Sequence, residues 1–307
     1  MSHPLQLIRV ISEGRPGHEN QSAGLAFALA RRTGAWVEVV RIPPTWNLLT
    51  RCRAALSSGP TRPQLVIGAG HKVHLPLWFA ARKFHARSVV IMEPTWPKRW
   101  FDLCILPRHD TAPGQSSARI IVTLGALNRI PEDIPAKQPQ GLMLIGGPSR
   151  ACGWDAPGLI AAITTVIRTR SELAWTITDS RRTPAGFLEQ LGAVGLSATV
   201  VPHQQTPAGW VPAHLLTAAE AWVTADSVSM IFEAVTARAR TGVIPVPAIR
   251  PGASPVRAIQ TLIREGYATT FDHWQRNGRQ LVSAKPLQET GRCAELVLER
   301  LSFHAAA

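Results

Sequence analysis

Short apolar runs alternate along the chain with segments in which apolar residues recur every three or four positions. A short apolar run favours a buried strand, and the longer spacing favours a helix with one buried face. In segment 20–34, Leu25, Ala28 and Leu29 share one helix face, and Gly34 provides a C-cap. In the first half, strands are predicted at 5–11, 35–42, 64–70, 87–93, 101–107 and 119–125. This alternation predicts an α/β fold with a mainly parallel sheet.

Segment 128–140 interrupts the pattern. It reads NRIPEDIPAKQPQ, with three prolines and no periodicity, which is typical of a linker. After it the alternation resumes, and strands are predicted at 141–147, 173–180, 197–201, 221–227 and 241–246. We therefore expect a first Rossmann-like domain at 1–135, a second at 136–290, and a C-terminal helix within 291–307 that could pack back on the first domain.

The charge balance narrows the class of partner. The 307 residues include 33 Lys and Arg against 20 Asp and Glu, a net charge of +13, which favours anionic partners. The basic residues are nearly all Arg, they are spread along the chain, and there is one Tyr, so no nucleic-acid module is predicted. No apolar stretch approaches the ~20 residues of a membrane-spanning helix. The N-terminus lacks the features of a signal peptide, so we expect a cytoplasmic protein.

The four cysteines lie far apart in the sequence. No C-x-x-C pair occurs, and no histidine stands at ligand spacing from a cysteine. Neither a disulfide framework nor a metal site is predicted, and buried thiols are the expected state.

In an open parallel sheet, ligands gather at the carboxyl ends of strands, next to the N-termini of the following helices. The first such loop is 12–21, which reads SEGRPGHENQ. Its glycines allow a tight turn, and an imidazole is suited to accepting a proton near neutral pH. The alternative is a glycine-rich turn in which His18 or Glu13 only caps the helix. The residues of interest here are Glu13, Gly14, Gly17, His18 and Asn20.

The second loop, 68–76, repeats a glycine turn followed by a polar residue at a helix start. Here Gly70 precedes His71, and His74 follows three residues later. The two histidines raise the question of a metal site. No HExxH motif and no third ligand accompany them, so a metal is not predicted.

Three further loops follow strands of the second half. In GGPSR, at 146–150, the amides of Gly147 and Ser149 could hold a phosphate, although the Walker lysine is absent. In TDSRRTP, at 178–184, Arg181 and Arg182 could clamp a diphosphate, or the loop could be a solvated charged turn.

The last loop, within 223–234, carries the most specific pattern. Asp226 and Ser227 are predicted to cap a helix, with Ser229 in its first turn and Glu233 one turn later on the same face. Such an arrangement offers hydroxyls and backbone N–H groups to a phosphate, and a carboxylate to a ribose diol.

Taken together, five motifs resemble the bacterial branch of the mitochondrial fission ELM-one family. They are GRPGHENQ, GAGH, PRHD at 107–110, SRRTP and TADSVSMIFEA, in this order. More distantly, the architecture resembles GT-B glycosyltransferases, in which two Rossmann-like domains with mainly parallel sheets face each other across a cleft. The glycine turn with a nearby histidine is similar to that of the enzyme that adds N-acetylglucosamine to lipid-linked muramyl peptide.

The resemblance implies a role for each motif. His18, or Glu13 in its place, would deprotonate an acceptor hydroxyl. The implied donor-binding residues are Gly147, Ser149, Ser180, Arg181, Arg182, Asp226, Ser227, Ser229, Met230 and Glu233. The implied acceptor-side residues are Gly14, Gly17, Asn20, Gly70, His71, His109 and Asp110.

These implications lead to one functional hypothesis. The protein would be a metal-independent inverting glycosyltransferase, without a cofactor, that uses a nucleotide-diphosphate sugar and an anionic glycolipid such as lipopolysaccharide core. Peripheral contact with the cytoplasmic face of the inner membrane would fit the net charge. Two alternatives stay open: a nucleotide-sugar 2-epimerase on the same fold, and a non-catalytic interaction protein that has retained the fold.

Overall fold

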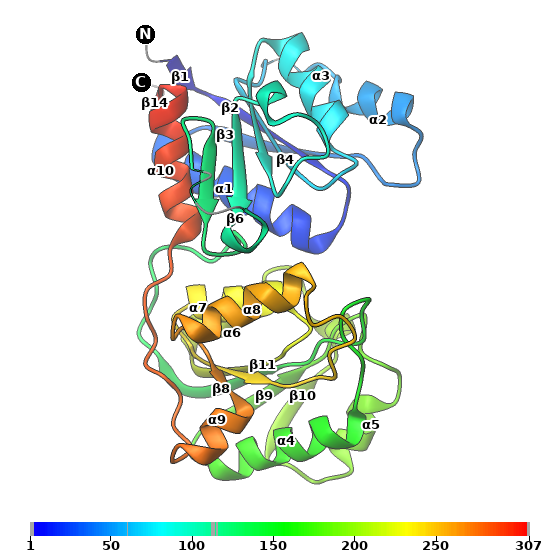
Figure 1. Cartoon of the computed structure of the whole chain (residues 1–307), viewed down its shortest axis with the longest axis vertical. Helices are drawn as coiled ribbons and strands as arrows, with labels where there is room; N and C mark the ends of the chain where they lie inside the picture. The colour runs from blue at the N-terminus through cyan, green and yellow to red at the C-terminus, as the bar shows by residue number, and fades with distance from the viewer. Residues whose placement is uncertain (1–2, 60, 112–113, 115, 306–307) are drawn as a thin grey trace. The chain divides into compact units, whose positions relative to one another are not determined.

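The chain forms two compact units in the computed structural model, which describes residues 3–59, 61–111, 114 and 116–305 (Figure 1). Unit 1 combines Met1–Arg129 with Gln288–Ala307, and unit 2 is Ile130–Leu287. The chain therefore passes from one unit to the other twice, after Arg129 and again after Leu287.

Unit 1 contains a sheet of six parallel strands, each of which overlaps a predicted run. In chain order they are β2 (Leu7–Ser12), β3 (Trp36–Arg41), β4 (Leu65–Ala69), β5 (Arg87–Ile91), β6 (Leu103–Pro107) and β7 (Ile120–Thr123). Across the sheet the order is β3-β2-β4-β5-β6-β7. The strand order reverses between β2 and β4, which is where open parallel sheets bind ligands.

Helices cover both faces of this sheet, because successive side chains of a strand point to opposite faces. Ile8 and Val10 share a core with α1 (Pro16–Thr33) and α10 (Glu289–Leu301). Ile11 instead packs with α2 (Leu48–Ala55) and α3 (His74–Phe84).

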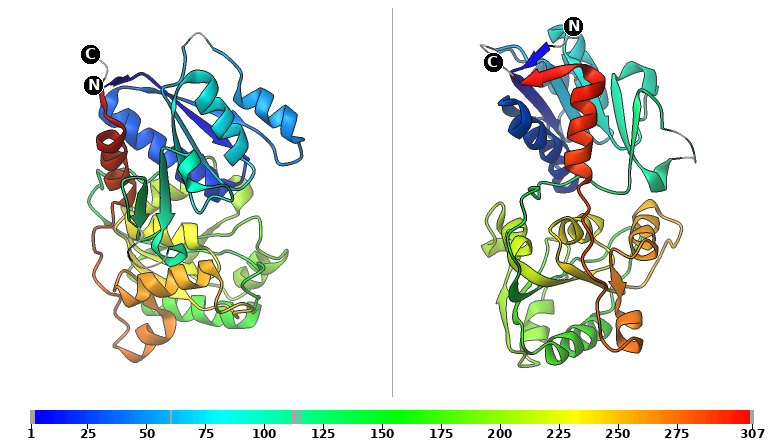
Figure 2. Two further views of the ribbon diagram at one scale, coloured as in Figure 1. Left: turned by 45° about the horizontal axis from the view of Figure 1, so that its top comes forward. Right: turned by 90° about the vertical axis from the view of Figure 1, so that its left-hand side faces the viewer.

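The C-terminal helix α10 is part of unit 1. It packs along α1, and its Cys293, Ala294 and Val297 are buried in the same core as Leu25 and Leu29 (Figure 2). After α10, β14 (Phe303–Ala305) pairs in parallel with β1 (His3–Leu5). The two ends of the chain are therefore joined by both a helix pair and a strand pair.

Unit 2 contains a second parallel sheet. Its strands are β8 (Gln138–Leu144), β9 (Ala174–Thr178), β10 (Ala198–Val201), β11 (Ala218–Thr224), β12 (Arg240–Ile244) and β13 (Thr269–Thr270). The order across the sheet is β10-β9-β8-β11-β12-β13, which in chain order reads 3-2-1-4-5-6, the Rossmann arrangement. The reversal of strand order lies between β8 and β11.

Six helices cover the two faces of this second sheet (Figure 1). One face holds α4 (Ala156–Thr169), α5 (Phe187–Gly192) and α9 (Phe271–Arg276). The other holds α6 (Trp210–Thr217), α7 (Val228–Thr236) and α8 (Ser254–Arg264). Helix α7 begins directly beyond the carboxyl end of β11, next to the reversal point.

The sequence pattern did not predict α2. This short helix exposes Leu48 and Leu49, so its apolar residues do not follow the helical spacing that marks a buried face. The predicted linker 128–140 was also too long at its C-terminal end, since β8 already begins at Gln138. Backbone pairing of Gln138 with Ala218 and of Gln140 with Ala174 extends the strand through polar residues that hydropathy alone assigns to a loop.

Candidate functional site

The reversal point of unit 1 brings together two loops that are 50 residues apart in the sequence. Glu13 and His18 follow β2, and Gly70 follows β4. Because β2 and β4 are adjacent and parallel, their carboxyl ends lie at the same edge of the sheet. The structure thus combines the residues of the first and second predicted loops in one place.

Glu13 and His18 form a hydrogen-bonded pair. The Nδ1 of His18 lies 2.6 Å from Oε1 of Glu13, whose side chain is buried. An ionised carboxylate only accepts hydrogen bonds, so it pairs with the imidazole tautomer that carries its proton on Nδ1 and has Nε2 as an acceptor. Arg15 adds a positive charge, with its Nε 3.5 Å from the same Oε1.

Gly70 is required by this pair. Its φ of +100° favours glycine, and a Cβ atom at this position would lie about 2.5 Å from both Oε1 of Glu13 and Nδ1 of His18. Any larger residue would push the two side chains apart. The glycine of the GAGH motif therefore allows β4 to approach the pair.

The capping alternative for the first loop is wrong. Helix α1 begins with Arg15 as its N-cap, and no side chain caps it. Gly14, with a φ of +78°, forms the turn before the helix, while Gly17 and Asn20 lie in its first turns. His18 and Glu13 bond to each other and not to the helix amides.

His74 lies close to the pair but is not part of it. Its side chain is buried at the start of α3, and its Nδ1 lies 3.0 Å from Oγ1 of Thr95. Burial, together with the nearby His71 and His18 and against the effect of Glu13, lowers the pKa of His74 to about 4. His71 was predicted to stand at the start of a helix. It is instead exposed in the turn before α3, which begins at His74.

The PRHD motif follows β6 at the same edge of the sheet. His109 and Asp110 lie in a short 3₁₀ turn, Arg108–Asp110, with His109 Nε2 3.6 Å from Asp110 Oδ2. Strands β4 and β5 separate β6 from β2, so the motif lies at the same edge of the sheet as the Glu13–His18 pair but is not part of it.

The reversal point of unit 2 is organised by Asp226. Its side chain is fully buried, and its Oδ2 accepts hydrogen bonds from the Gly147 amide (2.9 Å) and from Nη2 of Arg182 (2.6 Å). Its Oδ1 is also buried, and no partner for it exists within the described part of the chain. Gly146 and Gly147 have no room for a side chain, because Asp226 and the backbone of Arg182 lie directly against them.

One prediction for these loops is wrong. The amides of Gly147 and Ser149 are not free to hold a phosphate, since they donate to Asp226 and to the Cys152 carbonyl. The hydroxyl of Ser149 closes the same turn by accepting from the amides of Ala151 and Cys152.

The two adjacent arginines differ in their surroundings. Arg182 is held by Asp226 and by the Gly147 carbonyl, 2.7 Å from its Nη1. Arg181 is exposed, and no contact ties it down within the described residues. Ser180 accepts a hydrogen bond from the Arg182 amide at 3.3 Å, which shapes the turn.

The N-terminus of α7 is available for a ligand. Ser227 is the N-cap residue, but neither its side chain nor that of Asp226 caps the helix, contrary to prediction. Among the residues that the structure describes, none accepts a hydrogen bond from the amides of Val228, Ser229 and Met230. Such unpaired N–H groups and the positive end of a helix dipole can receive an anion, and Glu233 lies one turn further along.

The sequence analysis missed one hydrogen-bonded pair of residues at the carboxyl edge of the unit 2 sheet. Asp179, directly after β9, accepts hydrogen bonds from the His203 amide (2.6 Å) and faces Nδ1 of the same histidine at 3.0 Å. His203 follows β10, the neighbouring strand. The available signal was a polar residue near the carboxyl end of each of two predicted strands, Asp179 within 173–180 and His203 two residues after 197–201.

The described residues contain no group of three or more His, Cys, Asp or Glu side chains that could hold a metal ion. Within the same residues, no helix combines the length and apolar character needed to cross a membrane.

Comparison with known proteins identifies both a family and a fold. Residues 16–301 match the model of a family described as Mitochondrial fission ELM1. No curated protein matches the sequence.

Several solved structures share the GT-B fold of this chain. A putative UDP-N-acetylglucosamine 2-epimerase from Listeria monocytogenes has a TM-score of 0.63 at 13% identity, covering 96% of this chain and 95% of that one. MurG from Acinetobacter baumannii has a TM-score of 0.54 at 14% identity, with 96% and 99% covered. A UDP-GlcNAc 2-epimerase from Neisseria meningitidis, bound to UDP-GlcNAc, has a TM-score of 0.53 at 12% identity, with 97% and 99% covered.

Proposed function

The chain belongs to the mitochondrial fission ELM1 family and has the GT-B fold, and from this premise we propose that it is an inverting glycosyltransferase. Its donor would be a nucleotide-diphosphate sugar and its acceptor a hydroxyl of an anionic glycolipid, such as lipopolysaccharide core. The enzyme would act in the cytoplasm, in peripheral contact with the inner membrane.

The free N-terminus of α7 at the reversal point of a Rossmann-type sheet carries the proposal. Three amides without an acceptor and a helix dipole favour the diphosphate of the donor, as in other parallel sheets. Glu233, one turn along the helix, would bind hydroxyls of the ribose or the sugar. Among the structures of similar fold, the Neisseria meningitidis epimerase is bound to UDP-GlcNAc and S. aureus MnaA is in complex with UDP, which supports this class of donor.

The Glu13–His18 pair would supply the base. The carboxylate fixes the proton on Nδ1, so Nε2 can accept the proton of the acceptor hydroxyl as the oxygen attacks the anomeric carbon. The bond from that carbon to the diphosphate breaks, and inversion follows from attack opposite the leaving group. In this assignment Glu13 orients His18 and does not act as a second base.

The leaving diphosphate would be stabilised by the protein itself. The α7 amides are fixed in the helix and would receive the developing charge without rearrangement, and the exposed Arg181 would turn toward it. Arg182 would contribute its remaining N–H groups while Asp226 holds its position. A metal ion is not part of the proposed mechanism.

Donor binding is the first property to test. We would measure the thermal stabilisation of the protein by a panel of nucleoside diphosphates and nucleotide sugars, for the parent and for Glu233→Gln. A ligand at 100 times its Kd stabilises a protein by about 2.7 kcal/mol. We expect the nucleotides of one nucleobase to stabilise the parent protein. In Glu233→Gln most of that stabilisation should be lost. Glu189→Gln, an exposed position on α5, is the matched control and should behave like the parent.

Turnover is the second property. His18→Gln should retain donor binding and lose release of the nucleoside diphosphate in the presence of a glycolipid fraction, by a factor of about 100 or more. Conversion of the sugar to its 2-epimer without an acceptor would favour an epimerase instead. If no nucleotide stabilises the parent, the interaction-protein hypothesis is the better one.

A further inference from the structure

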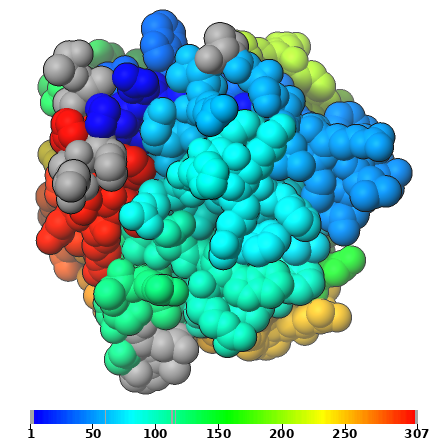
Figure 3. Space-filling view, turned by 90° about the horizontal axis from the view of Figure 1, so that it is seen from above, coloured from blue at the N-terminus to red at the C-terminus, as the bar shows by residue number. Residues whose placement is uncertain are grey.

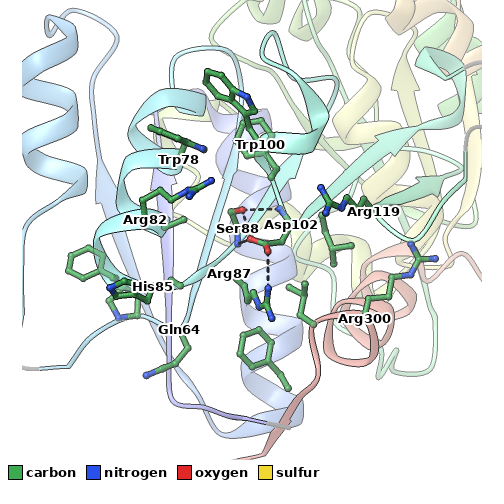
Figure 4. Close-up of a pocket in the computed structure, with 18 of the residues that line it drawn as sticks. Gln64, Trp78, Arg82, His85, Arg87, Ser88, Trp100, Asp102, Arg119 and Arg300 are labelled. Atoms are coloured by element: carbon green, nitrogen blue, oxygen red, sulfur yellow. Dashed lines mark hydrogen bonds and ion pairs between the residues drawn. The ribbon is translucent and has the colours of Figure 1, made fainter. Parts of the chain in front are cut away.

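Unit 1 has a hollow at the edge of its sheet opposite to the edge that carries the Glu13–His18 pair. Its volume is about 1020 Å³, and it lies at the amino ends of β4 to β7, between the C-terminal ends of α3 and α10. Figure 4 shows Arg82 and His85 on one side of it and Arg119 and Arg300 on the other, with Trp78 and Trp100 along the margin. None of the proposed catalytic or donor-binding residues lines this hollow.

The lining of the hollow is strongly basic. Among the described residues that line it are six arginines and a single carboxylate, that of Asp102. The six are Arg62, Arg82, Arg87, Arg99, Arg119 and Arg300. The formal excess is five positive charges in one concave surface, which favours an anionic ligand.

The one carboxylate is already fully used. Asp102 accepts hydrogen bonds from the amide and hydroxyl of Ser88, at 2.9 and 2.7 Å, and pairs with Arg87 at 3.1 Å. Within the described ranges, no ion pair neutralises the other five lining arginines, Arg62, Arg82, Arg99, Arg119 and Arg300. Their contacts are to backbone carbonyls and to a ring.

Individual contacts hold these guanidinium groups over the hollow. Arg119 donates to the Arg99 carbonyl at 3.4 Å, and Arg300 donates to the Ser117 carbonyl at 2.8 Å. Arg82 lies over the ring of Trp78, 5.3 Å from its centroid. Basic residues in the last turns of α3 and α10 also offset the helix dipoles, but Arg62 and Arg119 are in no helix and need another explanation.

A row of aromatic rings borders the hollow. Phe79, Trp78, Trp100 and Trp96 follow one another with centroid distances of 5.0, 5.3 and 5.1 Å. The two ends of the row, Phe79 and Trp96, are 42% and 38% exposed. Large apolar rings next to arginines are typical of protein surfaces that contact the membrane interface.

The part of the sequence that supplies α3 and β5 to this face shares the charge bias. Residues 43–101, which contain α2, α3 and β5, include nine Lys and Arg and a single acidic residue, Glu93. That glutamate is paired with Lys98 at 3.0 Å. Figure 3 looks onto this face, with the α3 region in cyan and the C-terminal segment in red on the same side of unit 1.

We propose that this hollow and its aromatic margin dock unit 1 on an anionic phospholipid bilayer. Headgroup phosphates would enter between the arginines, and the exposed edges of Phe79 and Trp96 would insert at the interface. A nucleic acid fits less well, because Trp100, stacked on Trp96 at 19°, already covers one face of that ring. The inference rests on the part of the proposed function that places the acceptor in a membrane.

The test is co-sedimentation of the whole protein with vesicles. Parent protein should bind vesicles of phosphatidylglycerol and phosphatidylcholine, and should not bind phosphatidylcholine alone. Arg82→Gln with Arg119→Gln should weaken binding about 30-fold, since each basic residue near an anionic surface contributes about 1 kcal/mol. Arg31→Gln with Arg168→Gln removes the same charge from exposed positions on α1 and α4, and should weaken binding clearly less.

A second variant tests the aromatic margin. Phe79→Ser with Trp96→Ser keeps every charge and should weaken vesicle binding at least about tenfold, by removing apolar area from the interface. Equal losses in the Arg31/Arg168 control, or binding to RNA without binding to vesicles, would overturn the proposal. Binding of soluble glycerol phosphate or inorganic pyrophosphate at the hollow, without vesicle binding, would also overturn it.

Nucleotide binding is measured in the same variants. It should be unchanged, because the hollow and the α7 N-terminus are in different units. Vesicle binding without nucleotide binding would leave the docking surface in place and remove the proposed transferase. Nucleotide binding without vesicle binding would rule out the docking surface and leave the proposed transferase in place.

Discussion

At the scale of single residues, two buried carboxylates organise the two reversal points. Glu13 positions His18 in unit 1, and Asp226 joins the loop after β8 to Arg182 in unit 2. Both are buried acids with named partners, and burying a charge without such partners would be very costly. The candidate site residues therefore have two different roles. Some can contact a ligand, and others, such as Glu13 and Asp226, hold the ligand-facing side chains in position.

His74 gives a prediction about stability and pH. Its pKa is about 4 in the folded protein and about 6.5 in an unfolded chain, so the unfolded state takes up a proton first as the pH falls. This histidine should therefore reduce the free energy of unfolding by about 3 kcal/mol between pH 6.5 and pH 4, and have no effect above pH 7. Urea unfolding at pH 7 and pH 4.5 measures this difference in the free energy of unfolding.

The matched variants are His74→Gln and His273→Gln. The first should lose less stability than the parent between the two pH values, because the buried imidazole is gone. The second changes an exposed histidine on α9 and should follow the parent. If all three proteins lose the same amount, His74 is not buried in its neutral form.

At the scale of elements, α7 is held from its C-terminal end by a residue of the predicted linker. Lys137 donates to the carbonyls of Leu215 and Leu216, at the end of α6, and of Ala237, at the end of α7. Burial, with Arg238 nearby, lowers the pKa of its amine to about 8. One side chain thereby satisfies carbonyls at two helix ends and fixes the helix whose N-terminus faces the proposed donor.

Replacing this lysine should loosen unit 2. Lys137→Met leaves three carbonyls without their donor, and we expect a loss of about 2–3 kcal/mol in the free energy of unfolding. Lys285→Met is the matched control, because its amine is exposed and contacts a single carbonyl, that of Glu265. It should change stability by less than about 0.5 kcal/mol. Equal effects of the two variants would contradict the role given to Lys137.

At the scale of the whole molecule, the two units have similar sheets but differ in net charge. Unit 1 carries 19 Lys and Arg against 9 Asp and Glu, and unit 2 carries 14 against 11. The net charge is thus +10 in unit 1 and +3 in unit 2. The excess charge of the chain belongs mainly to the unit for which we propose the acceptor and the bilayer, and only slightly to the unit for which we propose the nucleotide.

Each unit should lose stability separately. Leu301→Ala, at the end of α10, removes a buried side chain from the core of unit 1 and should cost about 2–4 kcal/mol. Leu262→Ala, on α8, is the corresponding change in unit 2. Hydrogen exchange followed by peptide mass spectrometry should show faster exchange in 3–129 and 288–305 for the first and in 130–287 for the second. Faster exchange throughout the chain in both variants would mean that the units unfold together.

The sequence by itself determined the local structure and the positions of the important loops. Apolar runs located the central strands of both sheets, and the loops after them contain Glu13, His18, Gly70, Asp226 and the start of α7. This works because burial on a strand or a helix face is recorded in the spacing of neighbouring residues. It fails for α2 and for the start of β8, where exposure or backbone pairing, and not hydropathy, defines the element.

Only the tertiary structure decided which of these residues meet. The order of strands placed Gly70 against the Glu13–His18 pair and Asp226 against Gly147, across separations of more than 50 residues. It also showed that the amides of Gly147 and Ser149 are already used, and that arginines from α3, β5 and α10 share one hollow. Pairing between distant segments leaves no local spacing in the sequence, because it depends on which strands become neighbours in the folded sheet.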